Sequence, residues 1–137
     1  MTGQRVAVVT GDARGIGAAV VSRLAGDGWA VIAVGRCAGD PGVPYQVASP
    51  DQLATLAAAL PQARPVQANV RDSAAVTGAV EAAQREFSRL DAAIAAAGVA
   101  VLGGRPAWEL PDANWRTLID MTWPCTPEAS AVTGFTG

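Results

Sequence analysis

Short apolar runs alternate along the chain with longer stretches whose apolar residues recur at helical spacing. An uninterrupted apolar run is typical of a strand buried on both faces, and the longer period is typical of an amphipathic helix. The runs expected to form strands are Arg5–Thr10, Ala30–Val34, Pro65–Val70 and Asp91–Ala95, and those expected to form helices are Ile16–Asp27, Asp51–Leu60, Ser73–Phe87 and Pro111–Met121. This alternation predicts an α/β fold with a doubly wound parallel sheet.

Polar and small residues mark where these elements begin and end. Gly28 is expected to end the first helix, and two prolines between Trp123 and Pro127 exclude a helix that continues past Met121. Glycine and proline predict loops over 37–50 and 98–110. The expected N-caps are Ser49 or Asp51 for the second helix, Asp72 or Ser73 for the third, and Asp112 for the last.

Composition narrows the class of protein. A length of 137 residues suits one domain, and a hydrophobic fraction of 50% argues against disorder. The net charge is −2 and the ten basic residues, all arginine, are scattered, so we expect neither nucleic-acid binding nor a membrane span. Cys37 and Cys125 are far apart, which predicts reduced thiols in a cytoplasmic protein and no metal site.

The strongest motif joins the first expected strand to the first expected helix. It reads Thr10-Gly11-Asp12-Ala13-Arg14-Gly15-Ile16-Gly17. Gly11 permits a tight turn, Gly15 lets the backbone approach a pyrophosphate, and Gly17 lets the helix pack against the strand. The N-terminus of the helix then offers N–H groups to phosphates, which predicts a nucleotide site of Rossmann type. Asp12 either forms hydrogen bonds within this turn or caps the helix.

This motif resembles the TGxxxGIG pattern of the short-chain dehydrogenase/reductase family. Asn69-Val70 stands where that family usually has Asp-Val at the adenine, and Ala95–Gly98 where it has Asn-Asn-Ala-Gly. Trp115–Met121 resembles the helix that ends in the family's Asp-Val-Asn, so the likeness runs from about Gln4 to Met121. The resemblance implies a nicotinamide cofactor, NAD or NADP, held by Thr10, Gly11, Asp12, Arg14, Gly15, Ile16, Gly17, Arg36, Asn69, Val70, Ala96, Ala97 and Gly98.

Other segments are similar to one subfamily, the mycofactocin-coupled dehydrogenases. They are Ala33–Cys37, Pro44-Tyr45 and Gly103–Glu109. This likeness implies a tightly held cofactor that passes electrons to a peptide-derived redox partner.

The family's catalytic groups have no counterparts in this sequence. The family uses Asn, Ser and a Tyr-x-x-x-Lys pair, whereas this chain has one tyrosine, Tyr45, and neither lysine nor histidine. Thr122 occupies the position of the asparagine that ends the corresponding helix in the family. Because no obvious general acid or base with a pKa near neutrality remains, we expect no hydride transfer by this chain alone. An active dehydrogenase with unusual catalytic groups is the weaker alternative.

The last residues resemble a part of the family that follows the catalytic segment, a pattern that an internal deletion, a gene-model error or a degraded gene would each produce. Cys125–Gly134 resembles the segment near the family's C-terminus. The chain is therefore interpreted as a truncated Rossmann fold, with a dinucleotide-binding half over 1–121 joined to a C-terminal remnant over 122–137. Such a fold is either a non-catalytic binding module or an unstable product. Its fourth strand is expected to be an exposed edge that favours self-association.

Two further sites leave alternatives open. At the end of the second strand, Gly35 replaces the acid that selects NAD, while Arg14 and Arg36 favour NADP unless they are merely solvated. The resemblance to the mycofactocin-coupled subfamily implies NAD instead. Asp40 is a weaker substitute for that acid. Trp108 and Trp115 either cap the core or line a substrate pocket. Arg105 is either a solvated loop residue or a contact to a substrate.

Overall fold

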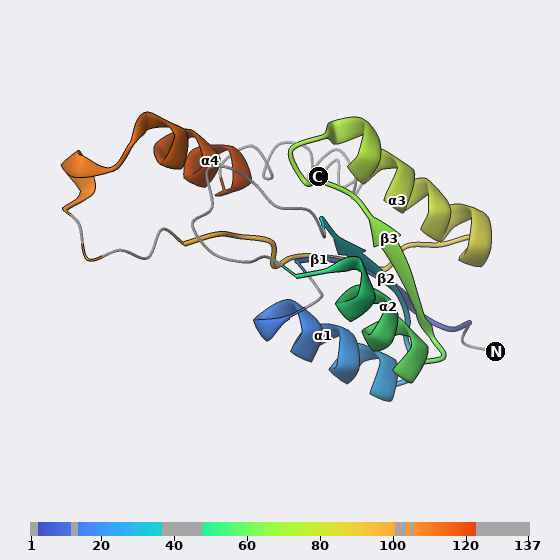
Figure 1. Cartoon of the computed structure of the whole chain (residues 1–137). Helices are drawn as coiled ribbons and strands as arrows, with labels where there is room; N and C mark the ends of the chain where they lie inside the picture. Colours follow the sequence, from blue (N-terminus) through green and yellow to red (C-terminus); the bar gives the residue numbers. More distant parts are fainter. Residues whose placement is uncertain (1–2, 12–13, 37–47, 101–103, 105, 123–137) are drawn as a thin grey trace.

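The computed structural model describes residues 3–11, 14–36, 48–100, 104 and 106–122. Its centre is a four-stranded sheet in the order β3-β2-β1-β4, and every neighbouring pair is parallel (Figure 1). The strands are β1 (Val6–Thr10), β2 (Ala30–Gly35), β3 (Ala63–Gln67) and β4 (Ala92–Ala95). The predicted parallel α/β fold is thus confirmed.

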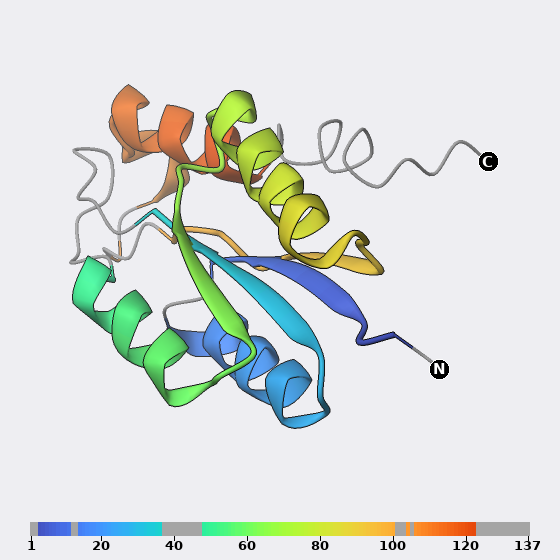
Figure 2. The same cartoon turned by 90° about the vertical axis from the view of Figure 1, so that its right-hand side faces the viewer.

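Helices cover both faces of the sheet, as a doubly wound fold requires. α1 (Gly15–Gly26) and α2 (Pro50–Ala59) lie on one face, and α3 (Ser73–Phe87) lies on the other (Figures 1 and 2). A short 3₁₀ helix, η1 (Ala107–Glu109), precedes α4 (Asp112–Thr122), which lies on the same side as α3 (Figures 1 and 2).

Alternate residues of β1 and β2 fill two cores, one on each face. Val6, Val8 and Ile32 pack with Ala79, Val80 and Ala83 of α3. On the opposite face, Val9, Val21, Val31, Ala33, Leu53 and Ala63 form the second core. Burial on both faces explains why the two central strands have uninterrupted apolar sequences.

Two of the three predicted helix caps are confirmed, and in both the first of the two candidate residues is the cap. Ser49 caps α2 in a reciprocal capping box with Gln52, in which the Ser49 Oγ accepts from the Gln52 N–H at 3.2 Å. Asp72 caps α3, because its Oδ1 accepts from the N–H groups of Ala74 and Ala75. Asp112 is not outside α4 but within its first turn.

The predicted bounds of the third strand were wrong. β3 spans Ala63–Gln67, not Pro65–Val70, because it pairs with β2 from Val31↔Ala63 to Gly35↔Gln67 and pairing stops where β2 stops. Pro65 is tolerated since β3 is an edge strand of the described sheet, where a missing N–H costs no ladder bond. Residues 68–70 leave the ladder and form a wall of the cavity described below.

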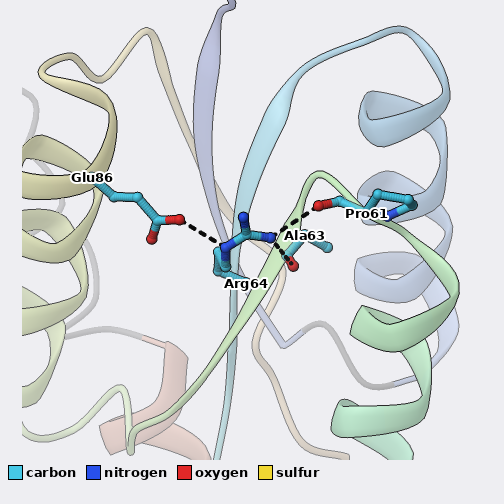
Figure 3. Close-up of polar contacts among 4 residues, drawn as sticks. All are labelled: Pro61, Ala63, Arg64 and Glu86. Atoms are coloured by element: carbon cyan, nitrogen blue, oxygen red, sulfur yellow. Dashed lines mark hydrogen bonds and ion pairs between the residues drawn. The ribbon is translucent and has the colours of Figure 1, made fainter.

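Arg64 covers this edge of the sheet (Figure 3). Its Nε donates to Glu86 Oε1 on α3 at 2.7 Å, and its Nη1 donates to the Pro61 carbonyl at 2.9 Å. A charged side chain and a proline on an edge strand discourage pairing with another sheet. β4, the opposite edge of the described sheet, has the sequence Ala-Ala-Ile-Ala and carries neither device.

Several predictions concern residues outside the described part of the chain. They include the roles of Asp12, Cys37, Asp40, Tyr45, Arg105 and Cys125, and the remnant assigned to 122–137, of which only the backbone of Thr122 is described. The predicted loop 98–110 contains η1 in its described part.

Candidate nucleotide-binding site

A cavity of about 270 Å³ lies at the carboxyl ends of the strands. Each of the four strands contributes residues at or just beyond its end. In an open α/β sheet, ligands bind at this edge, where the strand order reverses. The described lining is Gly11, Arg14, Ile16, Gly17, Val34, Gly35, Arg36, Ala48, Ala68, Asn69, Val70, Ala96, Ala97, Gly98, Val99 and Met121.

Gly11 is held where a side chain has no room. Its φ is +73°, and a Cβ built on it would lie 2.5 Å from the backbone of Ala97. Its N–H donates to the Val34 carbonyl at 2.9 Å, so the turn is fixed to the end of β2. The sequence predicted a glycine here for the tight turn, and the structure adds close contact with the segment after β4.

Gly15 lies in a different environment. Its φ is +59°, but a Cβ on it would meet nothing within 4 Å. The positive φ favours glycine at this position, and the open space beside it leaves the backbone accessible to a ligand. Arg14 is the N-cap of α1 and its side chain makes no cap hydrogen bond, so the first N–H groups of α1 face the cavity uncapped by it.

Ile16 is a lining residue with an unusual exposure. Its side chain is 79% exposed although it is large and apolar. Gly17 beside it is buried, which agrees with the predicted close packing of α1 on the sheet. Its exposure at the cavity makes this apolar side chain accessible to a bound ligand.

Thr10 was predicted to contact the cofactor but does not line the cavity. Its Oγ1 accepts from the Ala97 N–H at 3.4 Å, and its carbonyl accepts from the Ala96 N–H at 3.2 Å. Thr10 thus positions the wall formed by Ala96 and Ala97, and a direct contact with a cofactor stays a prediction.

Asn69 and Val70 form the wall that follows β3. The Asn69 Oδ1 accepts from the Arg71 N–H at 3.0 Å, and the Asn69 carbonyl accepts from the Asp72 N–H at 2.9 Å. This turn leads directly into α3, so the start of that helix fixes the wall.

Sequence reasoning missed part of the lining. Ala48, Ala68 and Val99 are small or apolar residues without a motif, and Ala68 was predicted to lie within the third strand. Met121 is 7% exposed and reaches the cavity from α4. No local pattern shows where the chain returns after residue 98, so this contact was not predictable.

The prediction that Trp108 caps the core was wrong. Trp108 is 85% exposed and is not among the described residues that line the cavity, and a contact with a substrate stays a prediction. Trp115 also lies outside the cavity lining, and its Nε1 donates to the Ala107 carbonyl at 3.2 Å. Both residues belong to the η1–α4 segment, whose packing on the sheet is sparse.

The chemistry of the described lining is that of a binding site. Its only charged residues are Arg14 and Arg36. Among these described residues there is no hydroxyl, thiol, imidazole, amine or carboxylate to act as a general acid or base. The described parts of the chain also contain no group of three potential metal ligands, and no helix there is long and apolar enough to cross a membrane.

Ionic contacts lie instead at the amino ends of the strands. The Asp91 Oδ2 accepts from the Val6 N–H and from the Arg89 Nε, each at 2.8 Å, and Arg89 also pairs with the Oδ1. The hydrogen bond from Arg89, followed by that from Val6, lowers the pKa of Asp91 below its ordinary value. Beside them, the Arg5 guanidinium lies 4.4 Å from the centre of the Trp29 ring.

The fold and the cavity define a dinucleotide-binding type of α/β domain, and comparisons with known proteins identify the family. Residues 5–126 match the family model described as short chain dehydrogenase. The chain belongs to the short-chain dehydrogenase family.

Proteins similar to this chain include bacterial oxidoreductases. An uncharacterized oxidoreductase of Mycobacterium tuberculosis is 38% identical over 121 residues, which cover 85% of this chain and 42% of that protein. An uncharacterized NAD-dependent oxidoreductase of the same species is 38% identical over 128 residues, with 87% and 46% covered. Carveol dehydrogenase from Mycobacterium avium, solved in complex with NAD, is 29% identical with a TM-score of 0.85 and is matched over 96% of this chain and 48% of that one. The chain spans about half the length of the proteins it matches.

Proposed function

We propose that this chain binds a nicotinamide dinucleotide, NAD or NADP, in the cavity at the carboxyl ends of the strands, as the nucleotide-binding half of a short-chain oxidoreductase. The observation that carries the proposal is Gly15, which adopts a positive φ beside open space at the start of α1. A backbone without a side chain at a helix N-terminus is what a pyrophosphate requires.

The relatives support the same ligand. The Mycobacterium avium enzyme was solved with NAD, and one Mycobacterium tuberculosis relative is described as NAD-dependent. The residues proposed to contact the nucleotide are those predicted from the sequence: Gly11, Asp12, Arg14, Gly15, Ile16, Gly17, Arg36, Asn69, Val70, Ala96, Ala97 and Gly98, with Thr10 behind them.

The 137 residues by themselves are proposed to bind the nucleotide without transferring hydride. The sequence has no lysine or histidine and one tyrosine, so it contains no Tyr-x-x-x-Lys pair. The likeness of Cys125–Gly134 to the family's C-terminal segment supports the loss of an internal segment. The likeness of Ala33–Cys37, Pro44-Tyr45 and Gly103–Glu109 to the mycofactocin-coupled dehydrogenases supports that subfamily and a redox peptide as the partner of a complete enzyme. A cytoplasmic location is proposed from the two cysteines, which are too far apart in sequence to suggest a disulfide framework.

Thermal unfolding of the purified chain, alone and with excess NADH or NADPH, tests the binding proposal. A ligand that binds only the folded state raises the Tm of the protein. The stabilisation is about 2.7 kcal/mol when the ligand concentration is a hundred times its Kd. We expect a cooperative transition that moves up with a dinucleotide and does not move with adenosine. A transition that neither dinucleotide shifts would overturn the proposal. An oxidation assay with simple alcohols is expected to show no turnover.

The edge of β4 is proposed as a site of self-association between two copies. Ala93 and Ala95 are exposed there, and no charge or proline interrupts the strand, in contrast to β3 with Arg64 and Pro65. Sedimentation equilibrium tests this: Ala93→Lys is expected to lower the association, while Thr77→Lys on the exposed side of α3 leaves it unchanged. A monomer at all concentrations would contradict it.

A further inference from the structure

The side chain of Asn69, in the cavity wall that follows β3, is turned in a defined direction. Its Oδ1 accepts from the Arg71 N–H at 3.0 Å, and only the oxygen of an amide can accept from a backbone N–H. Among the residues that the structure describes, no group accepts from the Asn69 Nδ2. Because Asn69 lines the cavity, its side chain offers a ligand there an N–H donor.

The order of the strands places this donor at one end of the proposed ligand. In a dinucleotide-binding fold, the pyrophosphate lies at the turn from the first strand to its helix, and the ribose lies at the end of the second strand. The sheet order is β3-β2-β1-β4, so a nucleotide that runs from β1 to β2 brings its base to the end of β3. Ala68 and Val70, on either side of Asn69, are buried apolar residues that suit the flat face of a purine.

Purines differ in the hydrogen-bonding groups on the edge that carries the substituent at position 6. Adenine has an amino donor there beside the acceptor N7, whereas a 6-oxopurine has two acceptors, O6 and N7. An asparagine that recognises adenine uses both ends of its amide, since the oxygen accepts from the amino group and the nitrogen donates to N7.

The orientation of Asn69 does not suit that pairing with adenine. Its oxygen is turned to the Arg71 N–H, so an adenine amino group would meet the Nδ2, which is also a donor. A donor instead matches O6 and N7, the two acceptors that arginine and lysine recognise on guanine. A mismatched pair of donors away from water loses affinity, because neither group has an acceptor.

We propose that Asn69 recognises the base of the dinucleotide as a hydrogen-bond donor, and that the site therefore prefers a 6-oxopurine such as hypoxanthine to adenine. This inference rests on the proposed function, since it concerns the base of the ligand in the same cavity. The nicotinamide and the pyrophosphate are the same in both ligands, so the preference concerns the base alone.

The direct test is calorimetric titration of the full chain with NADH and with reduced nicotinamide hypoxanthine dinucleotide. The two ligands have the same charge and differ only at the base. The hypoxanthine dinucleotide is expected to bind about tenfold more tightly, a difference of about 1.4 kcal/mol. The same ratio is expected between 5′-IDP and 5′-ADP, which lack the nicotinamide.

The variant Asn69→Asp exchanges the donor for an acceptor of the same shape. One carboxylate oxygen can keep the bond to the Arg71 N–H, and the other can accept from the amino group of adenine. The preference is therefore expected to reverse in favour of NADH, although the added negative charge weakens both ligands.

Gln84→Glu is the matched control, because it makes the same amide-to-acid change at an exposed position of α3 that does not line the cavity. It is expected to leave the ratio of the two affinities unchanged. Circular dichroism of each variant establishes that it folds.

The outcomes distinguish this inference from the proposal on which it rests. Equal binding of the two dinucleotides by the unmodified chain, or tighter binding of NADH, would overturn the preference for a 6-oxopurine while leaving dinucleotide binding intact. A ratio that Asn69→Asp does not change would remove Asn69 from the role. Binding of neither dinucleotide would overturn the proposed function, and the inference with it.

Discussion

The two ends of the sheet are built from different chemical groups. At the amino ends, side chains hold the structure together: Asp91 binds the Val6 N–H and pairs with Arg89, and Arg5 lies over Trp29. At the carboxyl ends, the contacts are mainly between backbone groups, and a cavity remains between them.

This difference separates stabilisation from binding. Side chains that satisfy one another's charges, as at the amino end, offer little to a ligand. Backbone N–H groups next to glycines leave space and donors for one, and binding residues are commonly found on such loops over a rigid scaffold. Substitutions at the two ends are therefore expected to have different signatures in stability and in nucleotide binding.

The largest effect is expected from Gly11→Ala at the carboxyl end. A side chain there must adopt a φ near +73° and overlap the Ala97 backbone. Positive φ and overpacking together cost about 3 kcal/mol or more of unfolding free energy. Urea denaturation followed by circular dichroism measures this loss.

Gly15→Ala is the matched control, because its φ is also positive but its Cβ meets nothing within 4 Å. We expect a loss of only about 1–2 kcal/mol in stability, together with the loss of most of the shift in Tm that a dinucleotide causes. Equal destabilisation by the two substitutions would refute the distinction between a packed and an open glycine.

An intermediate effect is expected from Asp91→Asn at the amino end. Because the folded-state pKa of Asp91 is lowered, the carboxylate stabilises the fold fully above its unfolded pKa of about 3.9, and this contribution disappears as the pH falls through the folded pKa. The variant is thus expected to have a lower Tm than the parent at pH 7.

The pH dependence identifies the cause. The difference in Tm between the parent and Asp91→Asn should narrow below about pH 4 and vanish once Asp91 is protonated. Nucleotide affinity at pH 7 should not change, since Asp91 lies at the other end of the sheet from the cavity. A Tm difference that is constant from pH 7 to pH 2.5 would contradict the ionic role.

The smallest effect is expected from Gly78→Ala, which lies in the interior of α3 and at neither end of the sheet. A Cβ there meets nothing within 4 Å and φ is not positive, so the substitution should raise the unfolding free energy by about 0.5–1 kcal/mol. Chemical denaturation should show this gain with unchanged dinucleotide affinity. A loss of stability would mean that a Cβ at position 78 is not free of contacts with its neighbours.

Much of this organisation could be predicted from local sequence. The apolar runs located β1 and β2 because both strands are buried on both faces, and the Gly11–Gly17 spacing located the turn between β1 and α1. Ser49 and Asp72 were recognisable as caps because capping depends on residues only a few positions apart.

Features that depend on distant parts of the chain were not predictable. The bounds of β3 follow from where β2 stops, and the position of Thr10 behind Ala97 follows from how β4 pairs with β1. Met121 reaches the cavity, and Trp108 remains exposed, because of the course of the chain between β4 and α4. Local sequence patterns do not show which residues far apart in the chain come into contact.

The most direct test of the central claim is a titration of the ¹⁵N-labelled chain with NADPH, followed by amide NMR shifts. Binding at the carboxyl ends predicts saturable shifts at Gly11, Gly15, Gly35 and Gly98, with little change at Val6 and Asp91. Saturable shifts centred on Val6 and Asp91, or none at any amide at millimolar NADPH, would contradict the account.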